Sequence, residues 1–273
     1  MASDLLNVPT QLVAFRNKLY NPSFYVNQRS NASGHFGVAA YGHDGLCGGA
    51  AGGVYTSAVS GLDTTITITG GTLVMPIEPA LIEGGTYTFS HDGTATARVW
   101  QGTIVSGTAV AYKTAPFTVM GLAANTQTNI EFTGGTILRP QFEPGSLATP
   151  FDRRPPAVTW ELCKRYYDTS YQNTYVGATT TGGYETLSAS MALLMLMGSI
   201  KYKAHMRVTP ALTLYSYTNG TAGAVTYIGS GADVVVTAVY GNSADGFGNI
   251  ALATALPANY GCYFHWTASA ELG

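Results

Sequence analysis

The residues best suited to chemistry are aromatic side chains that stand beside small polar ones in the C-terminal half. Two segments carry them, LYSYTNG at residues 214–220 and VYGNSADGFGN at residues 239–249. A ring can stack on the C–H face of a sugar while asparagine and aspartate bind hydroxyls, and tyrosine gives contact area at low entropic cost. The alternative is that these rings are half-buried strand residues. The candidate ligand-contacting residues are Tyr215, Tyr217, Asn219, Tyr240, Asn242, Asp245 and Phe247.

Patterns typical of enzymes are weak in this sequence. It contains no G-x-S-x-G and no H-E-x-x-H motif. Glu78 with Glu83, or Asp152 with Glu161, can be imagined as a glycosidase pair, but fifteen acidic residues supply such pairs by chance. No fixed-period repeat of the kind that builds a β-helix runs through the chain. We therefore expect binding rather than catalysis, and no cofactor.

Metal ligands are also sparse. Across a threefold axis one histidine, such as His205 or His265, would be present three times and could bind a metal, but a solvated or hydrogen-bonded histidine is the simpler interpretation. Cys47, Cys163 and Cys262 are far apart and show no C-x-x-C spacing, so buried free thiols are expected. Such thiols fit a reducing cytoplasm, and no metal site is predicted.

Composition excludes several classes of partner. Charged residues make up 10% of the 273, the net charge is −2, and no basic stripe is available for nucleic acid or an acidic membrane. The first 18 residues lack the basic start and continuous apolar core of a signal peptide. The most hydrophobic run, residues 191–197, is far shorter than the roughly 20 residues of a membrane helix.

The elements that would position these residues read as β-strands. TITIT at residues 65–69 alternates, and TITITGGTLV (65–74) is echoed by IEFTGGTIL (130–138), which predicts strand pairs turned at their Gly-Gly links. The glycine-rich segment 45–53 reads as a loop. Residues 200–207 alternate apolar and polar side chains over their whole length, which predicts a strand. Short strands at roughly ten-residue spacing favour antiparallel sandwiches, the first of them jelly-roll-like.

A proline-rich segment divides the chain. Prolines at 144, 150, 155 and 156 predict a stiff, extended connector, followed by one short helix that Thr159 can cap. The predicted organisation is an N-terminal segment (1–20), a β-sandwich (21–145), the linker and helix (146–168) and a second β-sandwich (169–273).

If residues 191–197 form a strand, both of its faces are apolar, so each face must be packed against another layer of protein. The domain's own second sheet could be one cover and a neighbouring subunit the other, which predicts an oligomer. The candidate interface residues are Met191, Leu193, Leu194, Met195, Leu196, Met197, Trp160 and Tyr167.

Four segments carry a resemblance to a known family. They are NPSFYVNQR (21–29), AYGHDG (40–45), QFEPGSLATPFDRRP (141–155) with ELCKRYY (161–167), and the C-terminal HWTASAEL (265–272). Together they resemble the tail fibre and receptor-binding proteins of tailed bacteriophages. The match is good from about residue 21 to 167 and weak from there to the last strand. One departure is Gly45-Leu46, where the family has Arg-Trp, so any contact of that tryptophan is absent.

The resemblance implies an all-β homotrimeric fibre that is assembled in the host cytoplasm and attaches the virion to a host-surface glycan or outer-membrane receptor. It also implies that the N-terminal segment binds a phage tail or baseplate protein, although a frayed terminus is an equal reading of the residues. Two alternatives are a fibre connector or decoration protein that docks another phage protein, and a capsule or lipopolysaccharide depolymerase. The candidate anchoring residues are Leu5, Leu6, Leu12, Val13 and Phe15.

Overall fold

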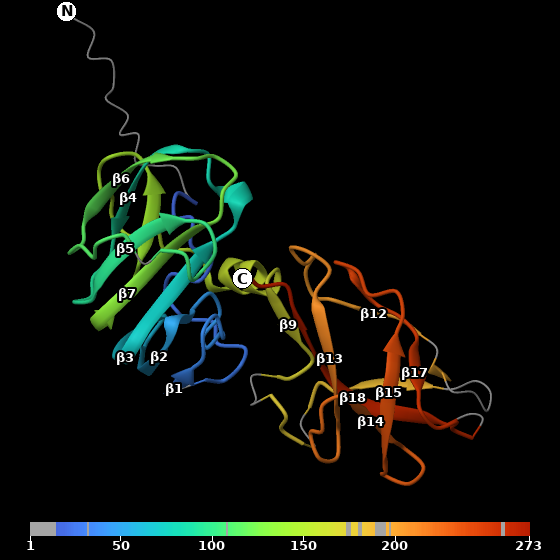
Figure 1. The fold of residues 1–273 in the computed structure, drawn as a ribbon. Helices are drawn as coiled ribbons and strands as arrows, with labels where there is room; N and C mark the ends of the chain where they lie inside the picture. Colours follow the sequence, from blue (N-terminus) through green and yellow to red (C-terminus); the bar gives the residue numbers. More distant parts are fainter. Residues whose placement is uncertain are drawn as a thin grey trace, which may run out of the picture. The chain divides into compact units, whose positions relative to one another are not determined.

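The computed structural model describes residues 15–31, 33–107, 109–172, 176–179, 182–188, 195–196, 198–257 and 260–273. Within them the chain is mainly β-strand in several antiparallel sheets, with one α-helix (Figure 1), which confirms the predicted all-β class. Contacts divide the chain into two compact units. The first unit comprises Met1–Tyr25, His35–Ala40 and Cys47–Pro155, and the second comprises Val26–Gly34, Tyr41–Leu46 and Pro156–Gly273. Two short N-terminal segments, Val26–Gly34 and Tyr41–Leu46, thus belong to the second unit. The domain boundaries predicted from the sequence, at residues 145 and 169, assume that each domain is one continuous segment.

The first unit holds two sheets that face each other. Phe89 of the smaller sheet contacts Phe132 of the larger one with ring centroids 5.6 Å apart, and both rings are fully buried. Contact between inner faces holds a β-sandwich together. The larger sheet has the order β1 (Ser33–Phe36), β2 (Cys47–Ser60), β3 (Asp63–Ile77), β7 (Thr128–Ile137), β5 (Thr96–Gln101), and the smaller β6 (Phe117–Leu122), β4 (Gly85–Ser90), β8 (Gln141–Pro144); a short 3-10 helix spans Pro79–Leu81.

The Gly-Gly pairs of this unit form a bulge, so the predicted turns are wrong. The register of β3 against β7 shifts between Ile68 and Thr72. Gly71 (φ 62°) and Gly134 (φ 59°) lie in the shifted stretch, in backbone conformations that favour glycine. A Cβ on Gly71 would lie 2.3 Å from the Gly52 carbonyl oxygen. The two T-G-G-T segments therefore oppose each other as one irregularity within two long strands.

The glycine-rich segment 45–53 also differs from the prediction. It is strand rather than loop from Cys47 onwards, with an irregular register between Gly48 and Gly53. A Cβ on Gly53 would lie 2.4 Å from the Thr72 carbonyl oxygen, so glycine lets β2 approach β3 closely.

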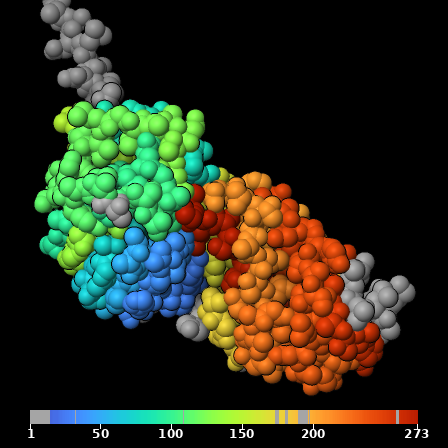
Figure 2. Space-filling view, in the orientation of Figure 1, coloured from blue at the N-terminus to red at the C-terminus, as the bar shows by residue number. Residues whose placement is uncertain are grey.

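The second unit is built around β18, which pairs on one edge with β10 and β9 and on the other with β14 and β13. Side chains alternate along it, and Phe264 and Trp266 point into a core that also contains Leu214. Strands β13 to β15 form much of the visible face of this unit in Figure 2. The strands are β9 (Tyr167–Thr169), β10 (Glu185–Ser188), β11 (Met195–Leu196), β12 (Ile200–Lys201), β13 (Ala211–Ser216), β14 (Ala224–Tyr227), β15 (Asp233–Val239), β16 (Gly246–Phe247), β17 (Ile250–Leu252) and β18 (Gly261–Ser269).

The helix α1 spans Pro156–Lys164, so it begins before the predicted start at Thr159. Proline fits the first helical position because the N–H that it lacks would have no partner inside the helix. Thr159 and Cys163 are buried, while Trp160 is half-buried. Trp160 therefore lies on a partly exposed face of the helix, and Thr159 and Cys163 lie on its buried face.

Residues 200–207 alternate in burial but form a strand only at Ile200–Lys201, so the predicted long strand is wrong. Beyond it the backbone leaves the sheet. Lys203 N–H donates to the Asp168 carboxylate at 2.7 Å, and Met206 N–H donates to the Ala244 carbonyl at 2.9 Å. These partners replace the ladder that strand pairing would have supplied.

The motif residues of the sequence meet in a buried polar network of the second unit. The Gln28 side chain donates to Asp44 Oδ1 at 2.7 Å and to the Tyr167 carbonyl at 2.6 Å. Arg29 lies 2.5 Å from Glu271 Oε2 and 3.6 Å from the centre of the Tyr167 ring. These motif residues therefore serve the architecture of this unit, whereas the motif residues 141–155 belong to the first unit.

The interface and anchoring candidates are only partly described. Leu196 is fully buried in the core of its own unit and Tyr167 is 4% exposed, so both are covered without a second subunit. Met195 is placed by its strand pairing with Ala251. Phe15 is 56% exposed. Met191, Leu193, Leu194, Met197, Leu5, Leu6, Leu12 and Val13 lie outside the described residues.

The three cysteines are buried thiols that form no disulfide. In the part of the chain that the structure describes, no helix is both long and apolar enough to cross a membrane.

Candidate functional site

The outer face of β13 and β18 carries a cluster of aromatic side chains. Successive side chains of β18 point to opposite faces of the sheet. Phe264 and Trp266 point into the core, so Tyr263, His265 and Thr267 lie on the other face, where Tyr215 of β13 is paired with His265. Tyr217 follows β13 and Tyr184 precedes β10. We call this set the aromatic face, with the residues Tyr171, Tyr184, Tyr215, Tyr217, Tyr263 and His265.

Ring contacts join these side chains into one surface. Tyr184 packs edge-on against Tyr217 and Tyr263, with ring centroids 4.9 and 5.0 Å apart. Tyr171 stacks on His265 at 4.2 Å and contacts Tyr215 at 6.0 Å. Tyr184 is 42% exposed, whereas Tyr171 is buried, so the cluster is anchored on one side and open on the other. Such fixed rings can receive the C–H face of a sugar without ordering a loop.

The electrostatics of the aromatic face are those of a neutral surface. Burial lowers the pKa of His265 to about 4, so its imidazole is uncharged at neutral pH. Ser170 Oγ accepts the Trp266 N–H at 2.9 Å and lies 3.1 Å from His265 Nδ1, which leaves the hydroxyl proton to be donated to the ring nitrogen. His265 therefore acts here as a rigid ring.

An open cavity of about 410 Å³ adjoins the aromatic face. Tyr215 belongs to both, and the cavity adds the Arg29 guanidinium and the Asn31 amide as polar groups. Its volume lies within the roughly 300–1,000 Å³ typical of small-molecule sites. The lining residues are Arg29, Asn31, Tyr167, Val176, Tyr215 and Thr267.

Two of the seven sequence candidates, Tyr215 and Tyr217, lie in the aromatic face. Asn219 is on the turn between β13 and β14, where its amide donates to Asp233 Oδ2 at 2.6 Å and its oxygen accepts the Thr221 N–H. That side chain fixes the turn next to Tyr217.

The other four candidates belong to the segment between β15 and β17. Asn242 is held by the Tyr202 hydroxyl at 2.7 Å, and Asp245 by His205 Nδ1 at 2.7 Å. Phe247 is 2% exposed in the core, so its ring is not at the surface of the unit. Tyr240 is 51% exposed. The contacts given for these four residues are with other residues than those of the aromatic face, so they do not form part of that face.

Sequence reasoning missed Tyr171, Tyr184 and Tyr263. For Tyr263 a signal was present, because strict alternation in GCYFHWTAS places it on the same face as His265. Tyr171 and Tyr184 stand outside strands, and only tertiary contacts bring them to the cluster. Among the described residues no group of three or more histidine, cysteine or acidic side chains could hold a metal ion.

Comparisons with known proteins add little. No protein-family model and no curated protein matches the sequence. Two solved structures of discoidin II from Dictyostelium discoideum align with it, one of the wild-type protein and one of the native recombinant protein at 1.75 Å, each with 9% sequence identity and a TM-score of 0.23. The alignments cover 81% of this chain and 82% and 83% of those chains. At this level of similarity they support no inference about fold or function.

Proposed function

We propose that the chain is a subunit of a bacteriophage tail fibre or receptor-binding protein, which attaches the virion to the host by non-covalent binding of a surface glycan. The observation that carries the proposal is the aromatic face: six rings in mutual contact, neutral and partly exposed, beside a cavity with an arginine and an asparagine. The resemblance of the motif segments to the phage family supports the viral assignment, and residues from several of them meet in the polar network of the second unit.

The proposal includes two β-sandwich domains, the first jelly-roll-like, in a homotrimer that is anchored to the tail or baseplate through its N-terminal segment. Three copies of one weak site raise the apparent affinity through effective concentration, so each glycan contact need not be strong. The protein would be assembled in the host cytoplasm and act on the virion.

The test is adsorption of the purified chain to host cells, and its competition with phage. Tyr184→Ala and Tyr217→Ala remove half-exposed rings of the aromatic face and should each weaken adsorption roughly tenfold or more. Tyr240→Ala is the matched control, because that tyrosine is 51% exposed but lies in the segment between β15 and β17. Normal adsorption by the first two variants, or loss with Tyr240→Ala alone, would contradict the assignment of the site.

A second candidate is a fibre connector or decoration protein. It is favoured by exposed apolar side chains of the first unit, where Val59, Met120 and Leu147 are 76–78% exposed. Exposed apolar groups of this kind can form a protein interface. Electron cryo-microscopy of the virion would distinguish the two, since a connector has a phage protein on these apolar side chains and another on the aromatic face, whereas an adhesin leaves the aromatic face free.

A further inference from the structure

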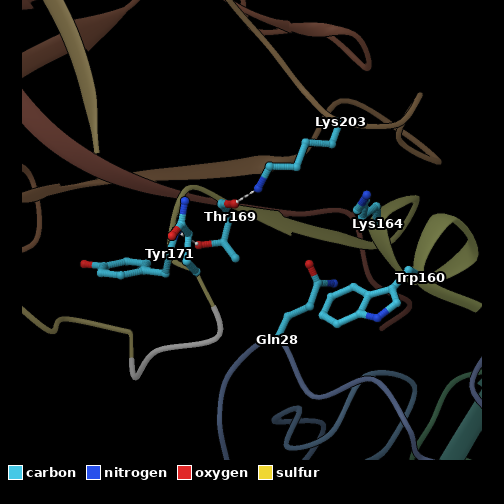
Figure 3. A pocket seen from close by; sticks show the side chains of 7 residues that line it. Gln28, Trp160, Lys164, Thr169, Tyr171 and Lys203 are labelled. Atoms are coloured by element: carbon cyan, nitrogen blue, oxygen red, sulfur yellow. Dashed lines mark hydrogen bonds between the residues drawn. The ribbon is translucent and has the colours of Figure 1, made fainter. Parts of the chain in front are cut away.

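A second cavity of the second unit, of about 400 Å³, has a different chemistry from the aromatic face. Figure 3 shows Trp160 and Lys164 of α1 on one side and Tyr171 on the opposite side, with Lys203 extending toward Thr169. The lining residues are Gln28, Trp160, Lys164, Thr169, Tyr171, Gln172 and Lys203.

The aromatic wall of this cavity is fixed by the helix. Thr159 and Cys163 are buried and hold α1 in place, so Trp160 projects from a rigid element and remains half-exposed. A tryptophan in this state offers the largest flat surface that a side chain can present to a sugar ring. Stacking therefore has a defined platform.

The charged side chains that line the cavity are both cationic. Two of its seven lining residues are lysines and none is acidic. Lys203 Nζ donates to the Thr169 carbonyl and lies 3.5 Å from Asp168, while Lys164 Nζ lies 2.8 Å from Glu161, whose side chain is 59% exposed. An ammonium has three N–H donors, and a pair with an exposed carboxylate is weak. Lys164 therefore keeps donor capacity because its partner is exposed, and Lys203, whose partner Asp168 is buried, keeps it through the remaining N–H of its half-exposed ammonium.

A positioned acceptor completes the lining. The Gln28 side chain is 4% exposed, and its amide nitrogen is engaged by Asp44 and by the Tyr167 carbonyl. The amide orientation is fixed by these bonds, so the carbonyl oxygen is the group left to accept a ligand hydroxyl. Ring, cation and hydroxyl acceptor together match a sugar that bears a carboxylate.

We infer that this cavity binds an acidic saccharide unit of the uronic acid type, with its ring on Trp160 and its carboxylate at Lys164 and Lys203. The source of the saccharide as host-surface glycan rests on the proposed function, but the cavity, its lysines and its ligand chemistry do not. The aromatic face, which is neutral, and this cavity thus select different parts of a glycan.

The test is calorimetric titration of the full chain with a disaccharide of glucuronic acid and glucose, and with its methyl ester, which is the same size but uncharged. The acid should bind at about millimolar affinity or better and the ester at least tenfold more weakly, with added salt weakening only the acid. Inorganic phosphate should bind more weakly than the acid because it cannot stack. Equal affinity for acid and ester, an affinity for phosphate that matches the acid, or undetectable binding of the acid at about 10 mM would overturn the inference.

Variants locate the binding. Lys164→Gln and Lys203→Gln should each weaken the acid roughly three- to tenfold, and Trp160→Ala should weaken acid and ester alike. Lys201→Gln is the matched control, because Lys201 is exposed and close in sequence but does not line the cavity. The Lys164→Gln variant is expected to fold normally, because the partner of Lys164, Glu161, is mostly exposed and can be solvated by water. Unchanged affinity in both lining variants, or an equal loss in the control, would overturn the inference.

Failure of this inference is distinguishable from failure of the proposed function. If Lys164→Gln and Lys203→Gln proteins bind the disaccharide normally while the wild type adsorbs to cells, only the inference about the cavity is lost. If the wild type binds the disaccharide through these lysines but does not adsorb to cells, only the adhesive function is lost.

Discussion

Replacement of Arg29 by alanine should destabilise the second unit more than any surface change. Its guanidinium lies 2.5 Å from Glu271 and 3.6 Å from the Tyr167 ring centre, and the side chain is 13% exposed. Above pH 8, where Glu271 is ionised, removal of one member of a buried pair typically costs about 3–5 kcal/mol, because the remaining charge has lost its partner. The lost contact with the Tyr167 ring adds roughly 1 kcal/mol. The expected loss is thus about 4 kcal/mol or more.

Tryptophan fluorescence can report on this unit alone. Trp100 belongs to the first unit, whereas Trp160 and Trp266 belong to the second, so the experiment uses a Trp100→Phe background. With a urea dependence near 2 kcal/mol per M, Arg29→Ala should lower the midpoint by about 2 M. The control is Arg16→Ala, which breaks the 3.1 Å pair with Glu143 in the first unit.

The dependence on pH sharpens the test. Burial raises the pKa of Glu271 to about 8, Arg29 opposes the rise and Asp44 adds to it. At pH 5 the Glu271 carboxyl is then protonated, so the penalty of Arg29→Ala should be smaller than at pH 9, where the carboxyl is mostly ionised. A midpoint shift below about 0.5 M at pH 9, which is under about 1 kcal/mol, would show that Arg29 does not hold the network together.

Three further predictions concern titration, backbone and thiols. Because the pKa of Glu271 is raised from 4.5 to about 8, its contribution to stability is complete below pH 4.5 and is lost as pH rises through 8; urea midpoints should show this loss in the wild type and not in Glu271→Gln. Gly71→Ala should cost about 2–4 kcal/mol in thermal unfolding, since its Cβ would meet a carbonyl oxygen, whereas Gly61→Ala, with a similar φ and open space, should cost only about 1 kcal/mol; equal costs would argue against the bulge. Burial raises the pKa of the Cys262 thiol to about 12, so a thiol reagent at pH 8 should label it only after denaturation, and rapid labelling of the folded chain would contradict its burial.

Local pattern predicted the strand class well and failed where tertiary contacts decide. Ile200, Tyr202 and Met206, which alternate with polar residues in the sequence, are all buried, but periodicity cannot tell a strand from an irregular segment held by Asp168 and Ala244. The helix existed as predicted, although its start lay three residues earlier because proline suits a first turn.

Glycine and tyrosine residues also show that local sequence does not determine tertiary contacts. A Gly-Gly pair serves a turn or a bulge equally well, and only the pairing of β3 with β7 selects the bulge. Tyrosines beside asparagine directed attention to Tyr215 and Tyr217, yet the same rule chose Phe247, which is buried. Lys164 of α1 and Lys203 after β12 are brought together only by folding, so the sequence could not show that they line the same cavity.

The network around Arg29 has a consequence for synthesis on the ribosome. Arg29 and Tyr41 emerge early, but their partners Glu271 and Leu272 follow 242 and 231 residues later. At 5–20 residues per second these early groups wait roughly 12 to 50 s for their partners. During that interval the nascent second unit lacks its closing contacts, so a polypeptide released before residue 271 cannot complete it.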